Sequence, residues 1–164
     1  MASLTHSLKK NILLPAIILL AAACHAPEGY HAFQTLPDEG WKRGDTLYFS
    51  LPRQTGTRPC RATLEIRHRG DYPYCSLWLL VSHNTADSLT FRTDTVECML
   101  VDKHGHFDGA GINDLYQKSF PLPDITLHEG SAPTFKIAPF MKDRLLEGIS
   151  DVGIRLTPTQ HPTE

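Results

Sequence analysis

The stretch "RATLEIR" (residues 61–67) alternates apolar and polar side chains at every second position. Ala62, Leu64 and Ile66 therefore fall on one face of an extended chain, while the polar residues fall on the other. A period of two is typical of a β-strand that packs one face on a core and exposes the other. The stretch predicts a strand of an antiparallel sheet.

Neighbouring segments extend the same signal. "CSLWLLVS" (75–82) is apolar on both faces, as a central sandwich strand would be, and "SLTFRTDTVECMLVD" (88–102) alternates in two parts. Three further runs carry similar signals: "DTLYFSL" (45–51), "PTFKIAP" (133–139) and "DVGIRLTP" (151–158). Turn-forming residues separate these runs at short intervals. The pattern predicts a mostly-β fold, an antiparallel β-sandwich of the jelly-roll or immunoglobulin-like kind.

One segment near the C-terminus shows a different period. Met141, Leu145 and Ile149 recur at every fourth residue. Pro139 is tolerated in a first helical turn, and Gly148 is placed to end a helix. We therefore expect one short helix near the C-terminus, packed over the end of the sandwich.

The N-terminal region is apolar without alternation. An apolar run of residues 12–23, interrupted only by Pro15, follows Lys9 and Lys10. A membrane-spanning helix needs about 20 apolar residues, so this run is too short to cross a bilayer. It fits the apolar part of a secretory signal, about 7–15 residues behind a basic start. We expect a signal peptide over residues 1–23.

Small residues lead directly into a cysteine after this run. Ala21, Ala22 and Ala23 precede Cys24, which resembles the lipobox of bacterial lipoproteins, where the thiol receives a diacylglyceryl group and becomes the mature N-terminus. An ordinary signal peptide cut near Ala23, with Cys24 unmodified, is the open alternative. With two or three acyl chains, the lipid bilayer would become a permanent partner of the protein through Cys24.

Composition limits the rest of the chain. A polar stretch interrupted by Pro and Gly predicts a tether over 24–40, followed by a β-sandwich domain over 41–158 and a C-terminal tail over 159–164. The 141 residues after the signal suit one domain. Two of the 16 Lys and Arg lie in the signal, which leaves 14 basic against 18 acidic residues. This mildly acidic balance argues against nucleic-acid binding.

Three cysteines lie beyond Cys24. Cys60 and Cys98 share the parity of core-facing neighbours, so we expect both to face the core. If residues 75–82 and 88–101 form a hairpin, Cys75 falls close enough to Cys98 for a bridge to be possible, with free thiols as the alternative. An odd count leaves at least one thiol free. No Cys or His pair has the spacing of a zinc site, so no metal is expected.

The remaining polar motifs give little support for catalysis. "VDKHGHFDGAGIND" (101–114) places Asp and His side chains at alternate positions, like an oxygen-rich calcium loop, but it lacks the glutamate that closes an EF-hand. A glycine-rich hairpin turn is the preferred interpretation. No G-x-S-x-G or similar motif supports a nucleophile. We predict a protein that is not an enzyme, with no cofactor and no small-molecule substrate identified.

Aromatic residues provide the candidate interaction surface. In "RGDYPYCSLWLL" (69–80), Tyr72, Tyr74 and Trp78 cluster at a turn and the strand that follows it. Large rigid side chains of this kind bind sugar faces or anchor protein partners when they are exposed. Trp78 lies inside an apolar strand, where packing in the core is the commoner outcome. The sequence leaves Tyr72 and Tyr74 open between surface and core.

Several of these motifs together resemble the gliding-motility lipoprotein H (GldH) family of Bacteroidetes. They are Cys24, Tyr30, the pattern of Trp41, Asp45, Leu47 and Phe49, "YPYCSLWL" at 72–79, the turn with Gly105, Phe107, Gly109 and Gly111, and "MKDRLLEGISDVGIRL" at 141–156. The resemblance covers nearly the whole chain after the signal. It implies an envelope lipoprotein that works with the gliding and type IX secretion apparatus and has no known catalysis.

The leading hypothesis is accordingly a non-enzymatic, lipid-anchored subunit that supports an envelope complex and has protein partners there. A carbohydrate-binding lipoprotein with an aromatic platform is the runner-up, and a hydrolase is a third class. His25 follows the cysteine with no acidic run that would direct export to the cell surface. We therefore expect the outer membrane, on its periplasmic side.

Overall fold

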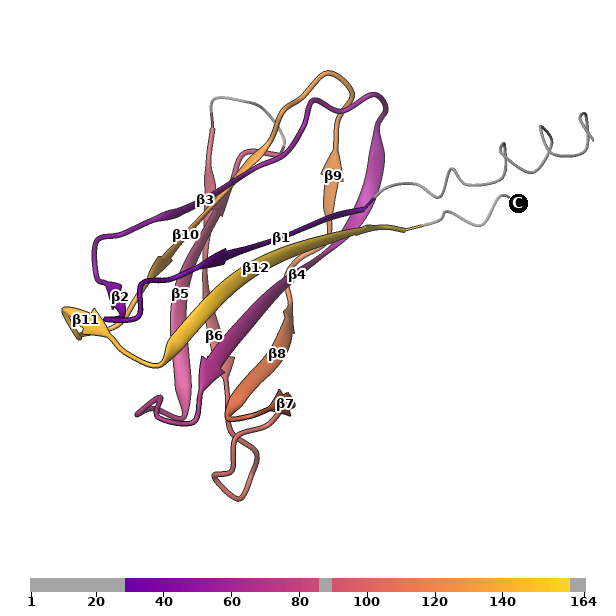
Figure 1. Cartoon of the computed structure of the whole chain (residues 1–164). Coiled ribbons are helices and arrows are strands. Elements are labelled where there is room, and N and C mark those ends of the chain that lie inside the picture. The colour runs from indigo at the N-terminus through magenta and orange to yellow at the C-terminus, as the bar shows by residue number, and fades with distance from the viewer. Residues whose placement is uncertain (1–28, 86–89, 160–164) are drawn as a thin grey trace, which may run out of the picture.

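The computed structural model describes residues 29–85 and 90–159, where every regular element is a strand (Figure 1). The strands that coincide with predicted runs are β3 (Leu47–Ser50), β4 (Arg58–Arg69), β5 (Ser76–His83), β6 (Arg92–Met99), β10 (Thr134–Pro139) and β12 (Ile149–Pro158). The further strands are β1 (Tyr30–Thr35), β2 (Trp41–Lys42), β7 (Ala110–Ile112), β8 (Leu115–Pro121), β9 (Ile125–Leu127) and β11 (Leu145–Leu146). The described part of the chain contains no helix of the length and apolarity that crossing a membrane requires.

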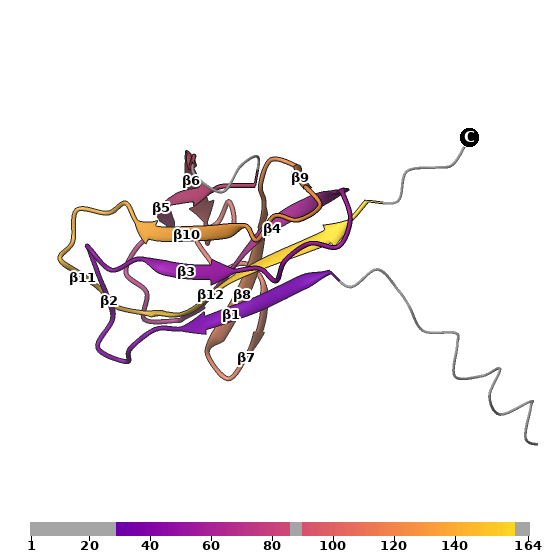
Figure 2. The ribbon, with the colours of Figure 1, turned by 90° about the horizontal axis from the view of Figure 1, so that it is seen from above.

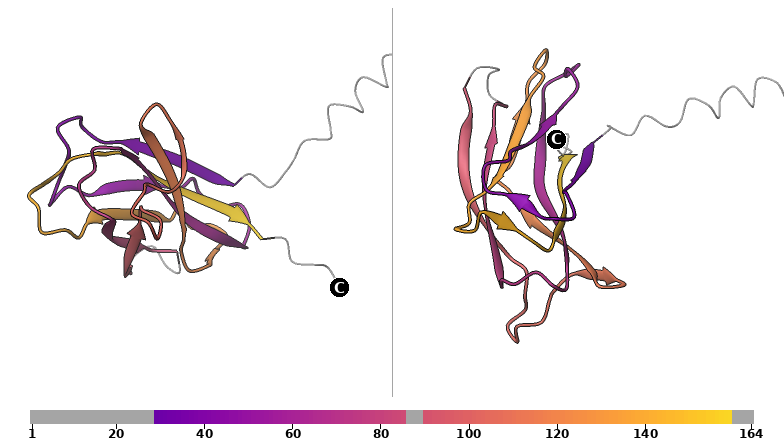
Figure 3. Two further views of the ribbon diagram at one scale, coloured as in Figure 1. Left: turned by 90° about the horizontal axis from the view of Figure 1, so that it is seen from below. Right: turned by 60° about the vertical axis from the view of Figure 1, so that its left-hand side comes forward.

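Two antiparallel sheets form the two layers of the fold. The six-stranded sheet has the order β1-β12-β4-β8-β7, with β9 pairing on the first part of β4. The four-stranded sheet has the order β3-β10-β5-β6, and Figures 2 and 3 show it lying opposite the larger sheet. The mostly-β, antiparallel sandwich-like fold predicted from the alternating runs is confirmed.

The core lies between the two sheets. Ala62, Leu64 and Ile66 of β4 are fully buried, as the period of two predicted, and Leu77 and Leu79 of β5 are buried in the same core cluster. Each of these leucine and isoleucine side chains contributes about 1.5–3 kcal/mol when it leaves water. The largest fully buried side chains also include Trp41, Phe49, Phe135, Leu100, Leu127, Ile137, Leu146 and Ile149.

The predicted helix near the C-terminus is wrong. Leu145 and Leu146 form β11, which pairs with β2, and the chain turns at Gly148 with a positive φ of 86° before β12. Leu146 is buried while Leu145 is exposed, so the buried positions do not follow the fourfold spacing. Pairing of Leu146 with Trp41 decides the structure here, because tertiary contacts override a weak local preference.

Part of the predicted tether belongs to the sheet. Tyr30–Thr35 form β1, an edge strand that pairs residue by residue with β12 from Tyr30↔Leu156 to Thr35↔Asp151. Its burial is only partial, because one side of an edge strand has no neighbour in its sheet. The predicted signal peptide and Cys24 lie outside the described residues, as does the tail from residue 160 onward.

The cysteines follow the predicted parity. β5 and β6 form the expected hairpin, in which Cys98 lies opposite Leu77, and both Cys60 and Cys98 are buried as predicted. Burial raises the pKa of the Cys98 thiol to about 12. The possible Cys75–Cys98 bridge does not form, because the three described cysteines are free and Cys75 is exposed just before β5, where its carbonyl accepts the N–H of Leu100.

Candidate interaction surface

Tyr72, one of the predicted surface residues, belongs to the core. Only 3% of it is exposed, and its hydroxyl donates to the carbonyl of Ser76 at 3.0 Å, which satisfies the buried polar group. Gly148 packs against it so closely that a Cβ there would lie 2.7 Å from the Tyr72 Cα. Tyr72 therefore holds the β4–β5 turn against the β11–β12 turn and is unavailable to a partner.

Tyr74 and Trp78 are each 39% exposed, so the expectation that Trp78 packs in the core is wrong. The parity of β5 explains the result: Leu77, Leu79 and Val81 face the core, and Trp78 lies on the opposite face. The strand is apolar on both faces, but only one face is covered. Exposed tryptophan on an open sheet face is a recognised feature of protein interfaces.

Phe140 lies beside Trp78, since its backbone N–H donates to the Trp78 carbonyl at 2.8 Å. Phe140 is 58% exposed, the highest value among the large apolar side chains of the described residues. Together these side chains line an open groove of about 650 Å³, whose lining residues are Tyr74, Trp78, Phe140, Met141, Lys142 and Asp143.

Sequence reasoning missed Phe140 and Met141 because it placed them in a helix. The alternation of 133–139 was the signal that would have found Phe140: the odd positions Phe135 and Ile137 are buried, so the even positions point outward. Phe140 continues that even series one residue beyond β10.

Further apolar residues extend the groove into a larger surface. Met99 lies opposite Ser76 in the β5–β6 ladder, at one edge of the four-stranded sheet. Tyr48 lies opposite Lys136 on β3, the strand at the other edge. We call the exposed set of Tyr48, Tyr74, Trp78, Met99 and Phe140 the aromatic face. It holds five of the seven large apolar side chains that are exposed in the described residues. Concentration of apolar groups on one side of a domain marks an interaction site.

Charged groups stand at the margin of the aromatic face. A hydrogen bond to the Asp143 carboxylate raises the pKa of Tyr74, and Lys142 lies next to it in the groove. The Lys136 ammonium lies 3.6 Å from the centre of the Phe91 ring. An apolar centre with a charged margin is the usual anatomy of a protein interface.

The outer face of the six-stranded sheet is ionic instead. Glu65 points outward from β4 yet is only 1% exposed, because its carboxylate lies 2.6 Å from the Arg155 guanidinium and 2.5 Å from Nε2 of His31. The Phe33 ring lies across Gly153, and the Arg67 guanidinium sits 3.8 Å above that ring. We call these residues the ionic face.

The histidine- and aspartate-rich loop is a turn, as predicted. Oδ1 of Asp102 accepts the backbone N–H groups of His104 and His106 at 2.7 and 3.0 Å, which lowers the Asp102 pKa. Asn113 and Asp114, both with positive φ, close the β7–β8 hairpin. Within residues 29–85 and 90–159, no group of three or more His, Cys, Asp or Glu is arranged to hold a metal ion.

Known proteins resemble the chain over most of its length. It is 26% identical over 152 residues to "Gliding motility lipoprotein GldH" of Flavobacterium johnsoniae, covering 89% of this chain and 94% of that protein. It is 23% identical over 147 residues to "Gliding motility lipoprotein GldH homolog" of Christiangramia forsetii, covering 85% and 89%.

Solved structures align at low similarity. The Eiger TNF of S. frugiperda has a TM-score of 0.38 at 12% identity, covering 83% of this chain and 96% of that one. The tomato aspermy virus structure has a TM-score of 0.38 at 10% identity, covering 94% and 96%. The "GldH lipoprotein" family model, in contrast, matches residues 28–156, from just before β1 to near the end of β12. The chain belongs to the GldH lipoprotein family.

Proposed function

We propose that this protein is a non-enzymatic, lipid-anchored component of the cell envelope that binds a protein partner through its aromatic face. The partner belongs to the gliding-motility or type IX secretion machinery, or to a related envelope complex. Membership of a lipoprotein family supports a lipid-anchored location in the envelope, with Cys24 as the proposed attachment residue. The two curated relatives are named for motility, and neither name states a catalytic activity.

The aromatic face is the observation on which this proposal depends. Tyr, Trp, Phe and Met are the residues enriched at the centres of protein interfaces. A fully buried aromatic side chain hides about 150–250 Å². Tyr74, Trp78 and Phe140 still expose between 39% and 58%, so a partner that covers them would gain part of that area from each. No other outer surface of the described residues gathers so many exposed large apolar side chains.

The position of the aromatic groove also suits a tethered protein. β1 begins at Tyr30, which lies opposite Leu156 of β12 and hence level with Ala62 in the first half of β4 (Figure 1). Tyr74 follows the opposite end of β4 in the chain. The 12 residues of β4 span about 40 Å at roughly 3.3 Å per residue. An anchor at Cys24 would hold the β1 end beside the bilayer and leave the groove facing the surrounding compartment, which we propose to be the periplasm.

Crosslinking in cells tests the proposed partner. The full-length lipoprotein, carrying a photo-crosslinking residue in place of Met99, is irradiated, extracted in detergent and purified with whatever it has captured. We expect one protein to dominate, and Trp78→Ala to reduce its yield at least tenfold, on the order of one interface hot spot. Leu115→Ala is the matched control, because Leu115 is equally exposed on the larger sheet. Equal capture by both variants would refute the proposal.

Location and process need separate tests. Protease added to intact cells should leave the protein uncut, and it should digest the protein once the outer membrane is permeabilised.

A strain that carries Trp78→Ala at normal protein levels should show the secretion or motility defect of the deletion strain. Normal secretion and motility in both strains would remove the link to this machinery.

Carbohydrate binding is the second candidate, favoured by the exposed Tyr74 and Trp78 beside Asp143 in one groove. Exposed aromatic rings beside a carboxylate are suited to the faces and hydroxyl groups of sugars. Glycan-array binding that disappears with Tyr74→Ala but persists with Tyr48→Ala, outside the groove, would support it. Absence of binding to all glycans by the folded lipoprotein would exclude it. Tyr72 is unsuitable for this test because it lies in the core.

A further inference from the structure

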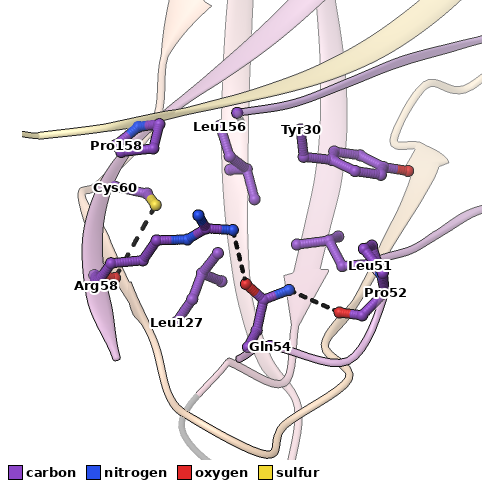
Figure 4. A pocket seen from close by; sticks show the side chains of 10 residues that line it. Tyr30, Leu51, Pro52, Gln54, Arg58, Cys60, Leu127, Leu156 and Pro158 are labelled. Carbon is purple, nitrogen blue, oxygen red and sulfur yellow. Dashed lines mark hydrogen bonds between the residues drawn. The ribbon is translucent and has the colours of Figure 1, made fainter. Parts of the chain in front are cut away.

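A second concave site lies at the end of the sandwich where β1 begins. Its walls come from β1, from the segment after β3, from β4, β9 and the end of β12, and it encloses about 100 Å³ (Figure 4). The lining is mostly apolar, with Leu51, Leu127 and Leu156 on different sides and Arg58 reaching into the middle. This site is separated from the aromatic groove by the length of β4.

Arg58 is incompletely satisfied in this pocket. Its Nη2 donates to Oε1 of Gln54 at 3.0 Å, but its buried Nε has no hydrogen-bond partner among the described residues. The ion pairs of the described residues include none with Arg58, whereas Arg155 is paired with Glu65. The side chain as a whole is only half-buried, but its Nε–H is shielded from water, and leaving such a donor without an acceptor is unfavourable. An oxyanion that enters the pocket would satisfy this donor and pair with the positive charge.

The neighbouring groups do not neutralise this charge. Gln54 is itself buried and donates through Nε2 to the Pro52 carbonyl at 2.6 Å, so it is fixed in place. Burial raises the pKa of the Cys60 thiol, and the positive charge of Arg58 acts in the opposite direction. The lining includes no Asp or Glu.

Size and chemistry define the ligand. At about 30 Å³ for each water, the pocket holds roughly three waters, which is the space of one oxyanion group. Guanidinium groups recognise phosphate and carboxylate oxygens through paired hydrogen bonds. Apolar walls around a single arginine suit an oxyanion that is attached to an apolar body.

We propose that this pocket binds the phosphate group of an anionic membrane phospholipid. Gly29 and Tyr30 line the pocket only five and six positions after Cys24, and five residues of extended chain reach at most about 18 Å. This choice of source rests on the proposed lipid anchor, which would bring the pocket to the level of the headgroups. Binding there would fix the orientation of the domain on the bilayer.

NMR of the arginine Nε–H groups in the full-length protein, held in a non-ionic detergent, tests the site directly. Inorganic phosphate should shift the Arg58 signal and slow its exchange with water. Nanodiscs with phosphatidylglycerol should reproduce the shift, and nanodiscs with phosphatidylcholine alone should not. Arg58→Lys lacks this signal, so its phosphate binding is measured by calorimetry beside the unchanged protein; it should weaken at least about tenfold, because the paired hydrogen bonds are lost. Arg61→Gln, which changes an exposed arginine of the same strand outside the pocket, should have no effect.

Three results would overturn the proposal. An Arg58 signal that responds to neither phosphate nor phosphatidylglycerol would show that the pocket takes no oxyanion. A response to inorganic phosphate alone would exclude the lipid as its source. A signal that changes with Glu28→Gln before any ligand is added would identify a carboxylate of this chain as the acceptor. None of these outcomes depends on the crosslinked partner, so the two proposals fail separately.

Discussion

The two outer faces of the sandwich differ in what their side chains contact. On the ionic face, Glu65 is enclosed by Arg155 and His31, and Arg67 lies on the Phe33 ring, so the charged groups satisfy one another. On the aromatic face, Trp78 and Phe140 have no covering layer. The first face is complete within the fold, and the second has apolar area left to bury.

This difference separates stability from binding. Substitutions on the ionic face should lower the free energy of unfolding, because they disrupt contacts made within the chain. Substitutions on the aromatic face should leave folding almost unchanged and remove contacts to other molecules. A matched glutamate on each face, Glu65 and Glu97, allows the first comparison.

Of the substitutions on the two outer faces, Glu65→Ala is expected to have the largest effect. It leaves Arg155 and His31 without their shared carboxylate, and we expect a loss of about 2–3 kcal/mol in the free energy of unfolding. Glu97→Ala, on an exposed position opposite Trp78, should change it by less than about 0.5 kcal/mol. Urea unfolding of both variants measures the difference. Equal effects would mean that the two faces do not differ in this way.

A somewhat smaller effect is expected for Gly153→Ala. The new Cβ would lie 2.7 Å from two atoms of the Phe33 ring and 3.1 Å from the Ala32 carbonyl oxygen, so β1 must shift. We expect a loss of about 1–2 kcal/mol from this crowding. Gly56→Ala is the control, since nothing lies within 4 Å of its Cβ position. Unfolding midpoints that are the same for both variants would contradict close packing of Phe33 on the sheet.

Acid should weaken the core beneath both faces. Burial lowers the pKa of His68 and of His83, so the folded protein keeps both rings neutral where the unfolded chain already binds protons. Stability is therefore present above the ordinary histidine pKa of about 6.5 and is lost as the pH falls below it, by at most about 1.4 kcal/mol per pH unit for each ring. His68→Phe should reduce this slope in unfolding curves between pH 7 and 5; an unchanged slope would disprove the role of His68.

Only a small effect on folding is expected for Trp78→Ala. Its side chain is partly exposed and lies outside the core, so the free energy of unfolding should fall by less than about 1 kcal/mol. Tyr72→Ala, six positions earlier, should instead cost about 3–5 kcal/mol because it empties a core position. Thermal unfolding of the pair shows whether the aromatic face is separate from the core. A large loss for Trp78→Ala would show that it is not.

Local periodicity was sufficient for the central strands. β4 has alternating residues and β5 is continuously apolar, and the sequence predicted both strands. For β4 it also predicted which positions face the core. For β5 the sequence could not say which face is covered, because both faces are apolar, and Trp78 was misplaced for that reason. Which side is left open depends on the other elements of the fold.

Other features depend on pairing between distant segments. β1 is recognisable only through its register with β12, and β11 only through Trp41, so local spacing suggested a tether and a helix instead. The burial of Glu65 depends on His31, 34 positions earlier, and on Arg155, 90 positions later. Of the predicted surface, Tyr74 and Trp78 come together and Tyr72 does not. Phe140 was missed because the segment after Pro139 was predicted to be a helix.

The β1–β12 ladder has a mechanical consequence for a tethered protein. Force from a membrane at the start of β1, opposed by a load at the far end of the sandwich, would act along the strand. Antiparallel hydrogen bonds lie perpendicular to the strand direction, so such a force shears all of them together. The six paired positions would share the tension, so β1 would resist being pulled away from the domain when force acts between the bilayer and the load.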